Sequence, residues 1–109
     1  MPELSLDEQY QKTIDDQRSH LLELQRLFNE KCDAAKKTAQ EKLAQIPDTD
    51  RESKEAVFGT EKQELEEALA WLKAEVNEST RHTMNKLEEI QRMREEKILH
   101  ELEQQMSKL

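Results

Sequence analysis

Helix-breaking residues are almost absent from this chain, and their positions constrain its fold more than any other feature. The one glycine is Gly59, and the one proline beyond residue 2 is Pro47. Proline lacks a backbone N–H and clashes with the preceding helical turn, so Pro47 ends any helix that reaches it. The sequence therefore predicts one long helix on each side of Pro47.

The start of the first helix is marked by the run Ser5-Leu6-Asp7-Glu8. This run is typical of a capping box, in which the Ser5 hydroxyl accepts from the Glu8 amide and the Glu8 carboxylate reaches back to the Ser5 amide. We expect the first helix to extend from about Ser5 to Ile46.

A turn is predicted at residues 47–50, because proline, aspartate and threonine favour turns. The second helix is expected over about residues 51–109, with a weak point at Gly59. A later start at Thr60 is the alternative, since a second possible capping box begins there. The prediction for residues 1–109 is a single coiled-coil module.

The composition explains why these helices should be amphipathic. Hydrophobic residues make up 34% of the chain and charged residues 39%, which leaves too little apolar material for a conventional core. Leucine, isoleucine, valine and methionine recur with a helical period. The fold class is therefore expected to be all-α.

The apolar residues follow an eleven-residue period better than a heptad, and this period predicts nearly straight helices or slight right-handed coiling. In the first helix the expected row is Leu6, Tyr10, Thr13, Gln17, Leu21, Leu24, Phe28, Cys32, Ala35, Ala39, Leu43 and Ile46. In the second helix it is Leu65, Leu69, Leu72, Val76, Thr80, Thr83, Leu87, Gln91, Arg94, Ile98, Leu102, Gln105 and Leu109.

We expect a long antiparallel helical hairpin that self-associates. A hairpin folded near residue 50 would place the net positive stretch 31–46 against the net negative stretch 54–69. The second helix would then extend past the first, leaving apolar residues near its end to dock on another copy or another protein. The alternative is a parallel dimeric coiled coil interrupted near Pro47.

Two groups of residues are predicted interaction sites. The expected self-association seam consists of Leu21, Leu24, Phe28, Leu65, Leu69, Leu72, Val76, Leu87, Ile98 and Leu102. A candidate partner patch, where apolar residues are densest, consists of Leu21, Leu22, Leu24, Leu27 and Phe28.

The sequence contains no pattern typical of an enzyme, and we expect no catalytic residue, cofactor or metal. His20, His82 and His100 each follow an acidic residue by four positions, a spacing typical of exposed side-chain pairs on a helix. Cys32, the one cysteine, lies in the expected seam and is interpreted as a packing residue.

The net charge of −8, with basic and acidic residues interleaved, argues against nucleic-acid binding. No membrane or small-molecule substrate is expected as a partner either. The expected partners are the chain itself and other proteins. The predicted location is intracellular, in cytoplasm or nucleus. The final Ser107-Lys108-Leu109 would indicate a peroxisome only if Leu109 is the true C-terminus.

These features favour a non-enzymatic interaction module that forms a scaffold or spacer in a larger assembly, such as one of the cytoskeleton or chromosomes. The alternative is a small adaptor or chaperone-like bundle that holds a client protein. A third possibility is an amphipathic helix pair on a lipid surface. The run 33–42 resembles the repeats of desiccation-protectant proteins, although over this short stretch only.

Overall fold

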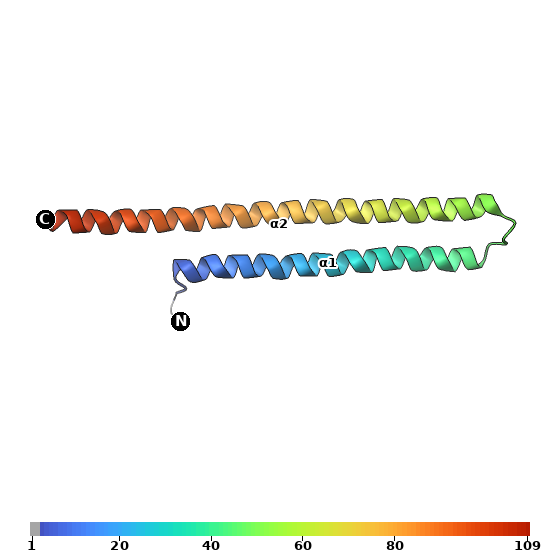
Figure 1. Cartoon of the computed structure of the whole chain (residues 1–109), viewed down its shortest axis with the longest axis horizontal. Coiled ribbons are helices and arrows are strands. Elements are labelled where there is room, and N and C mark those ends of the chain that lie inside the picture. Colours follow the sequence, from blue (N-terminus) through green and yellow to red (C-terminus); the bar gives the residue numbers. More distant parts are fainter. Residues whose placement is uncertain (1–2) are drawn as a thin grey trace. The chain divides into compact units, whose positions relative to one another are not determined.

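The computed structural model describes residues 3–109 and contains two helices, α1 (Leu6–Ala44) and α2 (Arg51–Ser107), joined by a turn (Figure 1). No strand occurs within the described residues. This confirms the all-α helical hairpin rather than a parallel dimer interrupted near Pro47.

The N-terminus of α1 is capped by Ser5. The Ser5 Oγ accepts a hydrogen bond from the Glu8 amide at 3.1 Å, and its hydroxyl donates to the Glu8 carboxylate at 3.2 Å. The Glu8 side chain thus meets the Ser5 hydroxyl, where the sequence suggested the Ser5 amide. Either contact fixes the first turn, because the first amides of a helix have no partner within it.

The turn between the helices begins earlier than the position of Pro47 alone suggested. α1 ends at Ala44, and the amides of Gln45 and Ile46 donate to carbonyls three residues back, at 3.1 and 3.2 Å. This tighter last turn fits the residue before a proline, which disfavours the α conformation. The Asp50 amide then donates to the Pro47 carbonyl at 3.0 Å, which closes the turn.

Asp50 caps the start of α2. One oxygen of its carboxylate accepts from the Ser53 amide at 3.2 Å and the other from the Ser53 hydroxyl at 2.7 Å. These bonds hold the pKa of Asp50 below its ordinary value. Nearby, an ion pair with Lys54 at 2.9 Å lowers the pKa of Asp48. From this cap α2 runs through Gly59 without interruption.

The described chain divides into two compact units. Unit 2 comprises Leu21–Asn77, and unit 1 comprises residues 3–20 together with 78–109. In unit 2, the two helical segments run antiparallel on either side of the turn (Figure 1). In unit 1, Gln17 contacts Ser79 and Thr83, and Asp7 contacts Arg94, so its segments are antiparallel as well.

The row expected in α1 faces inward in each unit. Leu24, Ala35, Ala39 and Thr13 are buried, and the other members of the row are half-buried. The buried Thr13 hydroxyl donates to the Gln9 carbonyl at 2.8 Å, which satisfies this polar group. The eleven-residue period of α1 is therefore the period of its inward face.

The row expected in α2 has the correct period but is wrong at several positions. Ala68 and Ile90 are buried, at 6% and 3% exposure, whereas Leu69 is 43% exposed. The observed inward residues of α2 are Val57, Glu61, Leu65, Ala68, Leu72, Val76, Ser79, Thr83, Leu87, Ile90 and Arg94. Leu69, Thr80 and Gln91 are exposed, because the inward stripe is centred to one side of the expected row.

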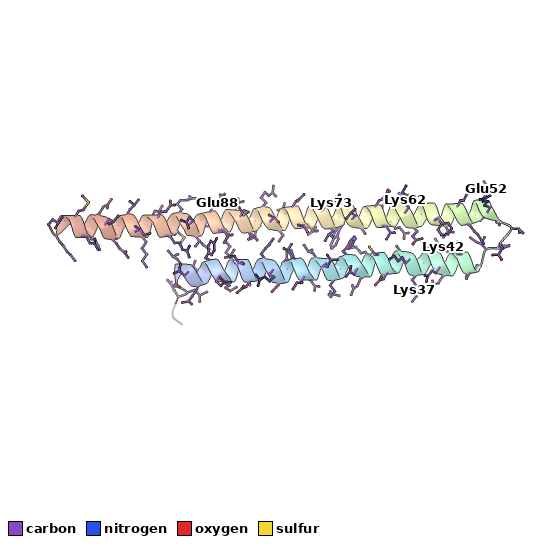
Figure 2. All side chains as sticks on the ribbon, in the orientation of Figure 1. Lys37, Lys42, Glu52, Lys62, Lys73 and Glu88 are labelled. Carbon is purple, nitrogen blue, oxygen red and sulfur yellow. The ribbon has the colours of Figure 1, made fainter. Side chains whose placement is uncertain are left out.

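Charged residues make up much of the remaining helix surface. Lys62 and Lys73 point outward from α2 and Lys37 from α1 (Figure 2), and all of them are exposed. Many ion pairs join residues three or four positions apart, such as Lys12 with Asp16 at 2.8 Å. Such exposed pairs stabilise a helix by only about 0.2–0.5 kcal/mol each. Most of the stability of the folded hairpin must therefore come from packing between the helices.

Candidate interaction surfaces

Unit 2 has an open groove floored by small side chains. Ala35 of α1 and Ala68 of α2 are buried at its base, and Trp71 and Glu64 lie along its α2 side. The Lys31 ammonium lies over the Trp71 ring, 4.7 Å from its centroid. Trp71 is half-buried at the edge of this groove, a position common for an aromatic side chain with a polar tip.

The structure divides the candidate partner patch. Leu24 is buried at 4% exposure, and Leu22 is 68% exposed. Leu21, Leu27 and Phe28 are half-buried. The packing of α1 against α2 in unit 2 therefore covers most of this patch, and Leu22 is the member that stays accessible. Whether the patch binds a partner stays a prediction.

Unit 1 carries a polar layer that includes Gln17 and Thr83, two polar members of the expected rows. The Gln17 side-chain oxygen accepts from the Ser79 hydroxyl at 2.6 Å and from the Thr83 hydroxyl at 2.7 Å. No buried side-chain polar atom in the described residues lacks a hydrogen-bond partner. A satisfied polar layer favours one register of the two helices, since a shift would leave these groups unpaired.

A shallow cleft beside this layer brings His20 and His82 together with Lys86 and Asp16. The acidic residues expected to pair with these histidines have other partners, since Asp16 binds Lys12 and Glu78 binds Arg81. The hydrogen bond from Arg81 lowers the pKa of Glu78. Within residues 3–109, no three His, Cys, Asp or Glu side chains are grouped as a metal ion would require.

Arg94 ties α2 to the start of α1 in unit 1. Its guanidinium forms an ion pair with Asp7 and lies over the Tyr10 ring, 4.8 Å from the centroid. Arginine suits this position because its planar group can pair with a carboxylate and stack on an aromatic ring together. The sequence offered a signal for this contact, as Tyr10 and Arg94 both belong to the expected rows.

Beyond Arg94, every residue of α2 is exposed. Residues 98–109, the last part of this exposed stretch, form the C-terminal extension. Its exposed apolar side chains are Ile98, Leu99, Leu102, Met106 and Leu109. Of the two members of the expected seam in this segment, Ile98 lines an open cleft with Ser5 and Leu6 at the start of α1. Leu102 is 49% exposed. The seam's role in self-association is untested.

The fold and these surfaces define a class, the all-α helical hairpins with thin interfaces. No protein-family model matches the sequence, and no curated protein or solved structure is significantly similar to it. Neither helix, over the residues described, has an apolar stretch long enough to cross a membrane.

Proposed function

We propose that this protein is a non-enzymatic interaction module, in which a helical hairpin self-associates to form a scaffold or spacer segment of a larger assembly. The observation that carries this proposal is the thinness of the hairpin interface. The buried apolar residues of the described chain are Leu24, Ala35, Ala39, Ala68 and Ile90, and no large side chain is fully buried.

These few buried side chains offset only part of the conformational entropy that the two helices lose on folding. Ordering a residue costs roughly 1–2 kcal/mol of backbone entropy. Burying a methylene group returns only about 0.8 kcal/mol, so the alanines contribute little. A hairpin that buries one stripe of each helix therefore gains substantially from further burial against a partner.

The surfaces of the hairpin support binding over catalysis. The groove of unit 2 and the cleft of unit 1 are open, and several of their polar residues pair with one another. By contrast, apolar side chains are exposed at Leu22, Phe58 and Met84 and throughout the C-terminal extension. Exposed apolar side chains that gather in one segment are typical of protein interaction sites.

The mass in solution tests this proposal. Light scattering at micromolar concentration should give a multiple of the 12.9 kDa chain mass. A helical monomer of that mass that melts cooperatively would contradict the proposal, because it would show that the hairpin is stable without a partner.

A further inference from the structure

The groove of unit 2 combines a floor of small side chains with a charged and aromatic wall. Ala35 and Ala68 lie at its base, each with 6% exposure. The α2 wall carries Glu64, Glu67 and Trp71 at steps of three and four residues, so these side chains are neighbours on one side of the helix. Glu64 and Glu67 are exposed and Trp71 is half-buried, so the wall is accessible from outside.

The Trp71 ring already receives a cation from within the chain. The Lys31 ammonium lies over the ring, 4.7 Å from its centroid, which is the geometry of a cation–π contact. Lys31 is itself exposed, and it forms no ion pair within residues 3–109. This ammonium shows which chemistry the ring face accepts, and its exposure leaves it open to exchange with another cation.

The two carboxylates beside the ring lack a cationic partner. Glu67 accepts a hydrogen bond from the neutral Gln63 amide at 3.2 Å. In the part of the chain that the structure describes, neither Glu64 nor Glu67 forms an ion pair. Lys31 is the one basic residue among those that line the groove. With two carboxylates against one ammonium, the lining has a net negative charge.

We propose that this groove binds a basic segment of another protein, with one arginine stacked on Trp71 and further basic side chains paired with Glu64 and Glu67. Arginine suits the site because its planar guanidinium stacks on an aromatic ring and pairs with a carboxylate. The incoming guanidinium displaces the Lys31 ammonium into solvent. The net charge of −8 also attracts a basic partner. This inference goes beyond self-association and does not depend on it.

Tryptophan fluorescence of the full-length chain tests the proposal, because Trp71 is its one tryptophan. The probe is an alanine-based helical peptide with three arginines at steps of three and four residues, the spacing of the groove wall. The control peptide has glutamine in place of each arginine. We expect the arginine peptide to change the Trp71 emission to saturation and the glutamine peptide to leave it unchanged.

The carboxylates of the wall are tested by a double variant. Glu64→Gln with Glu67→Gln should weaken binding of the arginine peptide about tenfold, because charge-assisted hydrogen bonds are lost. Glu66→Gln with Glu75→Gln is the matched control, since it removes the same charge from exposed positions of α2 outside the groove. At about 0.15 M salt, which screens remote charges, this control should change the affinity by less than about twofold.

The displacement of Lys31 gives an effect of opposite sign. Lys31→Ala should strengthen binding of the arginine peptide roughly two- to fivefold, because it frees the ring face. Lys36→Ala removes the same charge from an exposed position of α1 outside the groove, and it should leave the affinity almost unchanged. Circular dichroism confirms that each variant stays helical. Unchanged or weaker binding by Lys31→Ala would overturn the proposal.

Equal losses in the two double variants would also overturn the proposal, because they would reflect a general attraction to an acidic chain. So would an arginine peptide that leaves the Trp71 emission unchanged. Dilution of the chain without peptide tests a different occupant. If dilution changes the Trp71 emission of the native chain but not of the Glu64→Gln, Glu67→Gln variant, a second copy occupies the groove and the proposal fails. The mass by light scattering decides the proposed function separately.

Discussion

Single residues in this hairpin matter according to their position relative to a narrow inward stripe. Leu24 and Leu22 are both leucines of α1, yet the first is buried and the second is exposed. Thr13 and Gln17 are polar residues that lie inward, and hydrogen bonds satisfy both. Side-chain chemistry alone therefore does not decide burial, because the helical position decides which partners a side chain meets.

The substitution Leu24→Asp should destabilise the protein by more than about 3 kcal/mol, because it leaves an unpaired carboxylate among buried apolar groups. Denaturant unfolding followed by circular dichroism measures the change. Leu22→Asp is the matched control, and its effect should stay within about 0.5 kcal/mol. Equal effects of the two substitutions would show that Leu24 is not an inward residue.

At the scale of the helices, stability depends on how the N-terminus of each helix is capped and on whether its interior contains a residue that disfavours helix. Ser5 and Asp50 cap the two N-termini through side-chain hydrogen bonds. Gly59 is the residue of α2 that least favours a helix, since glycine loses the most backbone freedom on folding. Its φ is not positive, and no atom lies within 4 Å of a Cβ built there.

The cap at Asp50 makes the start of α2 sensitive to acid. Because the hydrogen bonds from Ser53 lower the pKa of Asp50, its ordinary value being 3.8, the ionised cap stabilises the folded state. That contribution is complete above about pH 3.8 and is lost as the pH falls through the lower folded-state pKa.

A carboxyl titration by nuclear magnetic resonance should therefore give Asp50 a pKa below 3.8, and Ser53→Ala should raise it. Asp50→Asn keeps a capping side chain without a charge, so its cap should not weaken over this pH range. A pKa of Asp50 that Ser53→Ala leaves unchanged would show that the hydroxyl does not stabilise the carboxylate.

Gly59→Ala should stabilise the protein by about 0.5–1 kcal/mol, because alanine favours the helix and fits the open space. Ala70→Gly, at an exposed position of the same helix, should destabilise it by a similar amount. Urea unfolding of both variants measures these changes. A loss of stability in Gly59→Ala would mean that residue 59 is not helical in solution.

At the scale of the whole molecule, the arrangement of helices could be predicted because few residues break a helix. Pro47 defined the turn, and the apolar residues of α1 defined its inward face. In α2 the period was correct but its phase was wrong at Leu69, Thr80 and Gln91. An eleven-residue period fixes only the spacing between inward residues. Two neighbouring rows of the same helix can have the same spacing, so the period alone does not show which row faces inward.

Ala68 and Ile90, the buried residues of α2, show which row of this helix faces inward. Ala68 is buried because a small side chain lets the helices approach, whereas the sequence row favoured the larger Leu69. Ile90 is apolar and its neighbour Gln91 is polar. The eleven-residue spacing used for the expected row nevertheless selected Gln91. The contacts of Gln17 and Arg94 could not be predicted in detail, because they depend on how α1 and α2 meet in unit 1.

This thin hairpin is expected to gain stability from association, and the melting temperature as a function of protein concentration tests that expectation most directly. Since a partner that binds only the folded state stabilises that state by mass action, the temperature should rise steadily over a roughly hundredfold range of concentration. A cooperative transition at one temperature throughout that range, with a monomeric mass, would contradict the claim.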